Sequence, residues 1–162
     1  TRGTSRDEYA AYTESPDAYQ RNMERLQLKW QTARQLVPSA EIVGRGGSVG
    51  VLYFGTTSLP IPEALDKLAV KGIHLDTCRV RAFPFGDEVE AFVAEHDLIF
   101  VVEQNRDAQM RTLLINELQT NPAKLISILY FAGLSISADF IDAQISAYYE
   151  EHKLARLTEV KS

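Results

Sequence analysis

Apolar residues recur near the start of the chain at the spacing of an α-helix. Ser15, Pro16 and Asp17 have the residue types of an N-cap, a first helical position and an acidic first turn. The apolar positions that follow, separated by alternating steps of four and three, are Tyr19, Met23, Leu26, Trp30, Ala33 and Val37. They predict one continuous stripe on a helix that ends before Pro38. The other faces are polar apart from Leu28, so the stripe must lie against this domain or against a neighbour, and both alternatives stay open.

From residue 39 onward, predicted strands alternate with predicted helices. Glu41 to Val43 is a weak strand, and stronger ones follow in VGVLYF, LDTCRVRAF, DLIFVV and LISILYF. DLIFVV is apolar on both faces, as expected of a parallel strand covered on both sides. Between the strands, helical spacing predicts helices from about Ile61, Asp87 and Ala108, with a last helix through Phe140, and Asp87 with the glutamate three residues later predicts a capping box. This alternation predicts an α/β domain with a mainly parallel sheet.

Size and charge narrow the class of protein. The 162 residues fit one domain, with 45% hydrophobic and 24% charged residues as in a globular protein. A net charge of -5 without a clustered basic face argues against a nucleic-acid or anionic-membrane partner. The apolar runs are too short to cross a bilayer and TRGTSRDEY lacks the apolar core of a signal peptide, so we expect a cytoplasmic protein. The chain opens without an initiator Met, and we expect it to be a piece of a longer polypeptide.

The glycine-rich stretch GRGGSVG resembles two known motifs without the context of either. It contains the G-x-S-x-G pattern of a serine-hydrolase nucleophile, but that motif needs a helix after the serine, and here a strand follows. It also lacks the spacing and the following helix of a phosphate-binding loop. We therefore expect a hairpin-like turn.

FGTTSLP connects a predicted strand to a predicted helix. The hydroxyls of Thr56 and Thr57 can hold an anion together with free backbone N–H groups, or they can cap the helix, which is the interpretation we favour. The histidines stand far apart without ligand partners, and His96 is expected on the surface at a helix C-terminus. Cys78 is the only cysteine and lies in a predicted strand, so it is expected to be buried and inert, with no disulfide or cysteine-based metal site.

The polar run Glu103 to Asp107 follows a buried strand and precedes a helix. Ligands of open α/β sheets gather at the carboxyl ends of their strands, so these residues are candidates for contact with a ligand or a partner subunit. The structural alternative is that Asn105 or Asp107 caps the helix while Glu103 pairs with Arg106. The acidic residues that a receiver-type signalling domain needs after its first and third strands are absent from the matching positions, which argues against that class.

Four stretches together resemble a known family: TRGTSRDEYAAYTESPDAYQRNMERLQLKW, VLYFGTTS, RVRAFPFGDEV and FVVEQNRDAQMRTLLINEL. In order and spacing they are similar to the C-terminal part of the alpha subunit of 2-oxoacid:ferredoxin oxidoreductases, closest to the 2-oxoglutarate branch. The resemblance implies a transketolase C-terminal-like domain, three-layer α/β/α, whose five-stranded sheet is mostly parallel with one antiparallel edge strand. Residues 1–38 would be the connecting segment with its amphipathic helix, 39–153 the domain and 154–162 a polar tail.

The same resemblance implies a complex that converts a 2-oxoacid, coenzyme A and oxidised ferredoxin to acyl-CoA, carbon dioxide and reduced ferredoxin. Thiamine diphosphate, magnesium and iron–sulfur clusters supply the chemistry in that family. This chain has no Gly-Asp-Gly diphosphate motif and one cysteine, so we expect it to be inactive alone and to brace the other domains and subunits. Glu103 and Asn105 match the family's VEQN stretch and are expected interdomain contacts, while Ala108 stands where many relatives have glycine. The alternative is a free-standing module that binds an anion or nucleotide at FGTTS.

Overall fold

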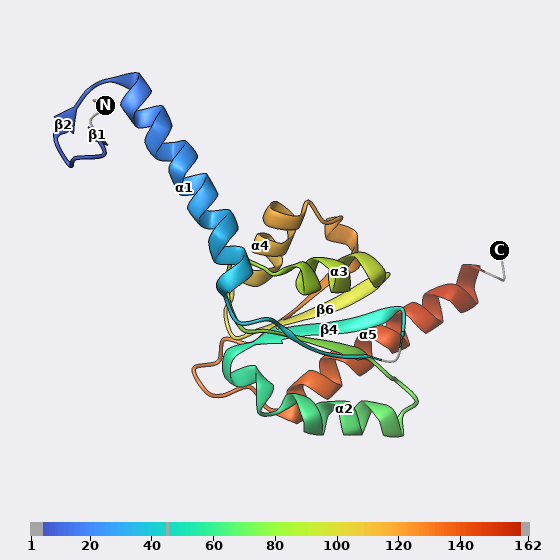
Figure 1. Cartoon of the computed structure of the whole chain (residues 1–162). Coiled ribbons are helices and arrows are strands. Elements are labelled where there is room, and N and C mark those ends of the chain that lie inside the picture. The colour runs from blue at the N-terminus through green and yellow to red at the C-terminus, as the bar shows by residue number, and fades with distance from the viewer. Residues whose placement is uncertain (1–4, 45, 160–162) are drawn as a thin grey trace.

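The computed structural model describes residues 5–44 and 46–159, with side chains up to residue 152 (Figure 1). Two short strands, β1 (Ser5–Arg6) and β2 (Tyr12–Thr13), form a hairpin that precedes helix α1 (Pro16–Leu36). The strands of the main sheet are β3 (Glu41–Val43), β4 (Val49–Phe54), β5 (Asp76–Val80), β6 (Leu98–Glu103) and β7 (Leu125–Leu129). The remaining α-helices are α2 (Ile61–Val70), α3 (Asp87–Glu95), α4 (Gln109–Leu118) and α5 (Ala138–Glu159), with 3₁₀ turns η1 (Gly55–Ser58) and η2 (Pro122–Lys124).

The main sheet has five strands in the order β3-β5-β4-β6-β7. All neighbours are parallel except β3, which pairs antiparallel with β5 at the edge. This confirms the predicted mostly parallel mixed sheet and the antiparallel role of the weak strand Glu41–Val43. Since parallel strands share one direction, the loops that follow β4, β5, β6 and β7 all emerge at one edge, which we call the carboxyl edge.

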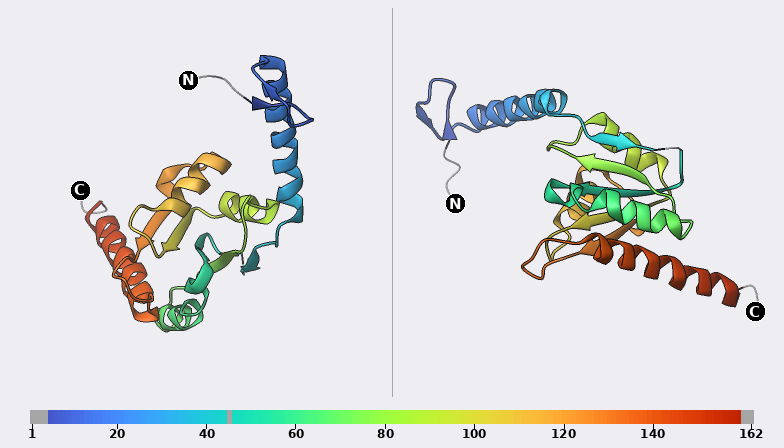
Figure 2. Two further views of the ribbon diagram at one scale, coloured as in Figure 1. Left: turned by 90° about the vertical axis from the view of Figure 1, so that its left-hand side faces the viewer. Right: turned by 90° about the horizontal axis from the view of Figure 1, so that it is seen from below.

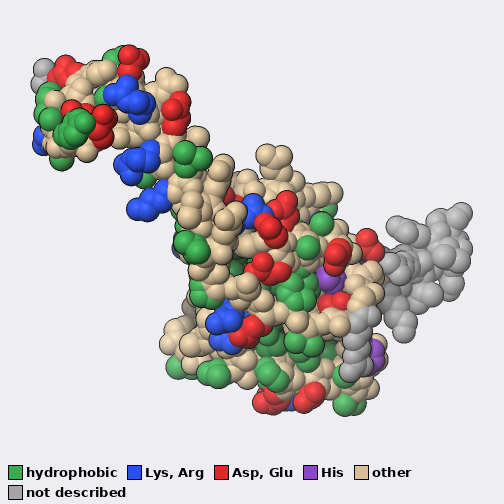
Figure 3. Space-filling model, in the orientation of Figure 1, with side chains coloured by type: hydrophobic (Ala, Val, Ile, Leu, Met, Phe, Trp, Pro, Cys, Tyr) green, Lys and Arg blue, Asp and Glu red, His purple; other side chains and the backbone are tan. Residues whose placement is uncertain are grey.

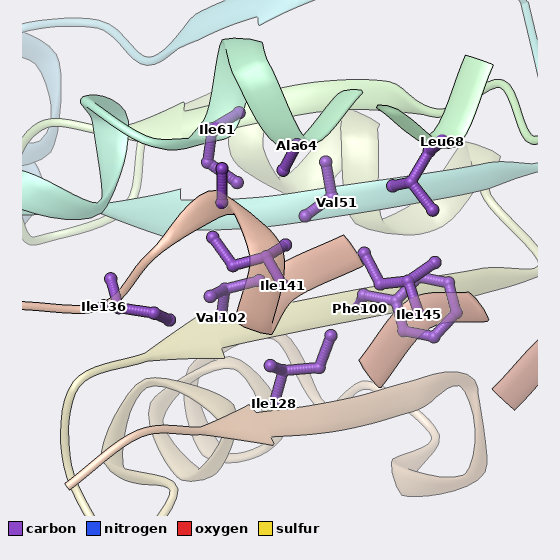
Figure 4. Packing of buried hydrophobic residues seen from close by; sticks show 11 residues of the cluster. Val51, Ile61, Ala64, Leu68, Phe100, Val102, Ile128, Ile136, Ile141 and Ile145 are labelled. Carbon is purple, nitrogen blue, oxygen red and sulfur yellow. The ribbon is translucent and has the colours of Figure 1, made fainter. Parts of the chain in front are cut away.

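Helices cover both faces of the sheet, which gives the predicted three layers (Figures 1 and 2). Helices α2 and α5 cover one face, where Val51 and Phe100 of the sheet contact residues such as Leu68 and Ile145 (Figure 4). Helices α3 and α4 cover the other face over a second cluster that includes Leu52, Phe92 and Leu114. Strand β6 therefore contributes to both cores and is buried almost throughout, as its doubly apolar sequence predicts. No helix in the described part of the chain is long and apolar enough to cross a membrane.

Helix α1 stands off this three-layer body and carries the β1–β2 hairpin at its far end (Figures 1 and 2). Its start is as predicted, because the Ser15 side chain accepts a hydrogen bond from the backbone N–H of Ala18 and Pro16 opens the helix. The hairpin is tied to the helix by Asn22, whose side-chain amide donates to the carbonyl of Arg6. We call the hairpin and α1 together the arm.

Two details of the helix ends differ from the predictions. Helix α3 has Gly86 as its N-cap with no side-chain hydrogen bond, so the predicted capping box of Asp87 and Glu90 is wrong. Both carboxylates bind Arg34 of α1 instead, an interaction between distant parts of the sequence that local patterns do not contain. At the C-terminus, helix α5 continues to Glu159, into the segment expected to be a polar tail.

Gly50 is required by a close approach of α3 to the sheet. A Cβ atom added to this glycine would lie 2.6 Å from Cζ of Phe92 and 3.2 Å from Cδ2 of His96. Both of those side chains are buried, so neither has free space to move away. The absence of a side chain at this position in β4 is what lets α3 lie so close to the sheet.

We expect Gly50→Ala to lower the free energy of unfolding by about 1–3 kcal/mol, the usual cost of overpacking a core. Urea denaturation followed by circular dichroism measures this change. The neighbouring substitution Ser48→Ala, at an exposed side chain, is the matched control and should change stability by less than about 0.5 kcal/mol. Equal stabilities of Gly50→Ala and the unmodified chain would contradict the close packing described here.

Candidate functional site

The carboxyl edge brings together the polar residues that follow β4 and β6. The side-chain amide nitrogen of Gln104 donates to the hydroxyl oxygens of both Thr56 and Thr57, at 3.1 Å each. Its carbonyl oxygen accepts from the backbone N–H of Ile136, beyond β7, at 3.5 Å. One glutamine thus links three strand ends. Neither η1 nor α2 has a side-chain cap, so the expected capping role of the threonines is wrong, and their hydroxyls serve as acceptors for Gln104.

Glu103 lies at the centre of the edge and has no exposed surface. Its carboxylate accepts from the backbone N–H groups of Met110 at 2.7 Å and Arg111 at 3.0 Å, at the start of α4, and from the amide of Asn105 at 2.8 Å. A carboxylate at a helix N-terminus satisfies free N–H groups and is stabilised by the positive end of the helix dipole. Glu103 therefore caps α4 from seven residues away and does not pair with Arg106.

Asn105 and Arg106 have different surroundings. The side-chain oxygen of Asn105 accepts from the backbone N–H of Asp107 at 3.1 Å and from that of Gln109, the first residue of α4, at 3.4 Å. The N-cap of α4 is Ala108, so neither Asn105 nor Asp107 is the cap residue that the sequence predicted. Arg106 is exposed and its Nε lies 2.8 Å from a carboxylate oxygen of Asp107. Of the five candidate residues, Thr56 and Thr57 are linked through Gln104, and Glu103 is bonded to Asn105, at this edge. Among the described residues, the ion pair of Arg106 is with Asp107.

The backbone conformation of Ala108 explains why many relatives in the resembled family have glycine at this position. This residue precedes α4 with a φ of 51° and ψ of 48°, the left-handed conformation that glycine adopts without cost. The turn lets the chain reverse after Asn105 so that the first N–H groups of α4 point back at Glu103. The glycine is thus explained by backbone conformation, and close approach of a ligand is not needed to account for it.

Exposed apolar side chains surround the polar network. Leu59 follows β4, and Phe131 and Leu134 follow β7, with 79%, 65% and 77% of their surface exposed. The arm leaves the body at the same edge, because the ring of Trp30 in α1 packs edge-on against Phe83, which follows β5, with the centroids 5.2 Å apart. Large apolar side chains that stay exposed near one edge of a sheet mark a candidate contact surface.

The stripe on α1 is only partly covered by the body. Leu26 and Trp30 keep 46% and 48% of their surface exposed, and Tyr19 near the hairpin keeps 48%. A groove of about 460 Å³ runs beside the helix, between the stripe residues Met23, Leu26 and Trp30 and Glu117 of α4. The sequence left open whether the stripe packs on this domain or on a neighbour. In the structure only the part of the stripe near Trp30 contacts the body, and the part toward the hairpin stays exposed.

The glycine-rich segment lies at the opposite, amino-terminal edge of the sheet. The expected hairpin-like turn is wrong, because β5 lies between β3 and β4, the two strands that this segment connects. The backbone N–H of Gly47 donates to a carboxylate oxygen of Asp76, at the start of β5, at 3.0 Å. His96 lies at the C-terminal end of α3 as predicted, but it is buried, and its Nε2 is 3.4 Å from the same carboxylate. Its expected surface position is wrong, because the helix end lies over the glycines of the turn and β4, where no side chains hold it away.

Cys78 is fully buried in β5, as predicted. Burial raises the pKa of its thiol to about 12, so the reactive thiolate is scarce at neutral pH. Among the described residues, no group of three or more His, Cys, Asp or Glu side chains is arranged to hold a metal ion. The side chains described here do not fit an iron–sulfur cluster, which needs several thiolates.

Comparison with known proteins identifies the fold first. No protein-family model matches the chain. A solved structure, 2-oxoglutarate:ferredoxin oxidoreductase from Magnetococcus marinus with 2-oxoglutarate, coenzyme A and succinyl-CoA bound, aligns with a TM-score of 0.76 over 90% of this chain and 26% of that chain, at 21% identity. The alpha chain of a probable 2-oxoacid ferredoxin oxidoreductase from Thermoplasma acidophilum aligns with a TM-score of 0.43 over 68% of this chain and 96% of that chain, at 21% identity. The first of these alignments shows that the chain has the fold of a domain found in an oxidoreductase.

The sequence comparison then gives the family. Subunit alpha of 2-oxoacid:ferredoxin oxidoreductase 2 from Aeropyrum pernix is 32% identical over 118 residues, which cover 69% of this chain and 18% of the relative. The chain is homologous to part of the alpha subunit of 2-oxoacid:ferredoxin oxidoreductases, which confirms the resemblance found in its sequence. It spans less than a fifth of the length of that curated relative.

Relief of the left-handed backbone at Ala108 provides a direct test of the local geometry. A non-glycine residue in this conformation costs about 1–2 kcal/mol, and glycine loses about 0.4–1 kcal/mol through the freedom of the unfolded chain. We therefore expect Ala108→Gly to stabilise the protein by about 0.5–1 kcal/mol in urea denaturation. Ala91→Gly, at an exposed position inside α3, is the control and should destabilise by about 1 kcal/mol.

Cys78 should resist thiol reagents in the folded protein. At pH 8 we expect it to react with 5,5′-dithiobis(2-nitrobenzoate) only at the rate of unfolding, and at once in denaturant. The raised pKa in the folded state also makes stability depend on pH. The thiol of the unfolded chain releases its proton above about pH 8.5, so the free energy of unfolding falls as the pH rises from there toward 12. Fast reaction of the folded chain would show that the thiol is accessible.

Proposed function

We propose that the chain is the non-catalytic C-terminal domain of the alpha subunit of a 2-oxoacid:ferredoxin oxidoreductase, and that it holds the other parts of the enzyme together. The complete enzyme would convert a 2-oxoacid, coenzyme A and oxidised ferredoxin to acyl-CoA, carbon dioxide and reduced ferredoxin. Homology to the alpha subunit supports this assignment. The sequence motifs resemble the 2-oxoglutarate branch most, so 2-oxoglutarate is the proposed substrate of the whole enzyme.

The observation that carries an assembly role is the exposed stripe of α1. A single helix turns Tyr19, Leu26 and Trp30 toward solvent, each about half exposed, on an arm that stands away from the body (Figure 3). An amphipathic helix gains most of its stability from burying such a stripe, and exposed patches of this kind mark protein contacts. The arm and the apolar surroundings of the carboxyl edge would together be covered by neighbouring domains and subunits.

The cofactors of the reaction would then be held elsewhere in the enzyme. Thiamine diphosphate, magnesium and iron–sulfur clusters supply the carbanion and electron chemistry in this family, and the one buried cysteine of this chain does not fit a cluster. We infer that ferredoxin and coenzyme A are partners of the complex rather than of this domain. The proposal keeps residues 1–38 as the connecting segment, 39–153 as the domain and 154–162 as its C-terminal extension, in a cytoplasmic enzyme.

A free-standing module that binds an anion or nucleotide has less support. The hydroxyls that would hold an anion, those of Thr56 and Thr57, both accept hydrogen bonds from Gln104, and the amide of Asn105 donates to Glu103. Taking the Asn105 amide to bind a ligand would leave the fully buried carboxylate of Glu103 with one donor fewer, and moving Gln104 would remove the partner of the buried Thr57 hydroxyl, which is costly. The network is thus better suited to fixing strand ends than to taking up a ligand.

Thermal melting of the purified chain separates the two functions. We expect no change in melting temperature with magnesium and thiamine diphosphate, coenzyme A, 2-oxoglutarate or ATP. A ligand at a hundred times its dissociation constant would add about 2.7 kcal/mol and raise the midpoint by a few degrees. Such a shift, abolished by Thr56→Val with Thr57→Val, would favour the binding module instead.

Substitutions in the stripe test the assembly role directly. Tyr19→Ser with Leu26→Ser should leave the fold of the isolated chain intact, because both side chains are half exposed, and should weaken its association with the remaining polypeptides of the enzyme at least about tenfold. Co-purification and isothermal titration measure this. Val70→Ser, at a residue of α2 that is 90% exposed, is the control and should have no effect. Unchanged association of the stripe variant would exclude the arm as a docking surface.

A further inference from the structure

A second face of α1 is basic. Arg21, Arg25 and Lys29 are four residues apart from one another, so they lie in a row along one side of the helix. At about 100° per residue, this basic face lies about a third of a turn around the helix from the stripe. All three side chains are exposed, and blue atoms recur along one side of the arm in Figure 3.

These three cations lack acidic partners within the residues that the structure describes. By contrast, Arg34, further along the same helix, contacts both Asp87 and Glu90 of α3. Like charges four residues apart destabilise a helix. The row therefore weakens α1 in the isolated chain, and an acidic partner would remove that cost.

The net charge of the connecting segment, residues 1–38, is opposite in sign to that of the rest of the chain. Residues 1–38 contain six Lys and Arg against five Asp and Glu, whereas residues 39–162 contain eleven against seventeen. The connecting segment thus has a charge of +1 and the rest of the chain -6. The basic face is a local inversion of sign, the arrangement that steers a specific charged partner.

We propose that Arg21, Arg25 and Lys29 bind an acidic protein surface on another domain or subunit of the same oxidoreductase, next to the surface that covers the stripe. This rests on the proposed function, and it adds the chemistry of the partner. Burial of the stripe supplies affinity, and the basic face fixes which way the helix lies and increases the rate of encounter.

Other occupants of the basic face fit less well. Two copies of the arm packed against each other through this face would bring basic residues against basic residues. A nucleic acid or an anionic membrane would be repelled by the charge of -6 on the rest of the chain. The carboxylates of Asp17 and Glu24 on the same helix would also oppose a polyanion. A local acidic patch on a protein avoids both penalties.

The test compares two variants with the same change of net charge. Arg21→Gln, Arg25→Gln and Lys29→Gln together remove three positive charges from the basic face. Asn116→Asp, Gln144→Glu and Ala147→Glu together add three negative charges at exposed positions of α4 and α5. Each variant is made in the complete alpha subunit, whose association with the other subunits of the enzyme is titrated between about 50 and 500 mM salt. Sedimentation of the isolated chain reports on self-association.

We expect the arm variant to weaken association about tenfold or more at low salt and to lose most of the salt dependence, while the control behaves as the unmodified protein. Equal affinity of the arm variant and the control would overturn the proposal and leave the assembly function standing. Association of the unmodified protein that does not depend on salt would have the same consequence. Salt-sensitive dimers of the isolated chain, abolished in the arm variant, would overturn it in favour of a second copy. Failure of the unmodified subunit to associate at all would overturn both the assembly function and this inference.

Discussion

The buried carboxylate of Glu103 is the interaction on which the carboxyl edge depends. It sits at the end of β6, the strand that contributes to both cores, and has no contact with solvent. A negative charge in such a place is tolerated only with several donors, and here two backbone N–H groups of α4 and the amide of Asn105 provide them. The carbonyl of the same residue accepts from Tyr130 after β7 at 2.9 Å, so one residue fixes a helix and a neighbouring strand.

At both edges of the sheet, polar loop groups form hydrogen bonds with other residues of the same chain. At the carboxyl edge, the hydroxyl oxygens of Thr56 and Thr57 accept from Gln104, and at the opposite edge the glycine-rich turn donates to the chain's own Asp76. Both segments have the composition of ligand-binding loops, yet each has hydrogen-bond partners that are distant in sequence. The polar groups at the strand ends therefore hold the body rigid, and the surface left for contact is the apolar one and the arm.

The helices, the strands and the mainly parallel sheet could be predicted because they depend on local periodicity and composition, whereas the three layers and the antiparallel edge strand were implied only by the family resemblance. Doubly apolar runs such as Leu98–Glu103 mark central parallel strands, and the Ser15-Pro16 start of α1 is a local signal. The site was predicted less well, because Glu103 finds its partners seven and eight residues onward only after the left-handed turn at Ala108. A signal for that turn was present in the glycine of the resembled family.

Other contacts had no local signal at all. Arg34 meets Asp87 and Glu90 across more than fifty residues, and Gln104 reaches back to Thr56 and Thr57 across nearly fifty. Such pairs are decided by how whole elements pack, so residue types and spacing along the chain favoured nearby partners instead. The buried position of His96 likewise follows from Gly50, which allows the end of α3 to approach β4.

The joint at the base of α1 makes the arm a rigid lever. The joint includes the Trp30–Phe83 ring contact and the Arg34 ion pairs, and from Pro16 to Trp30 the helix spans about 21 Å at 1.5 Å per residue. A rotation of about 10° at that joint carries the far end of the helix through about 4 Å, by the geometry of a rod of this length. A rearrangement of one guanidinium between two carboxylates would thus be amplified into a displacement as large as a side chain, at the point farthest from the body.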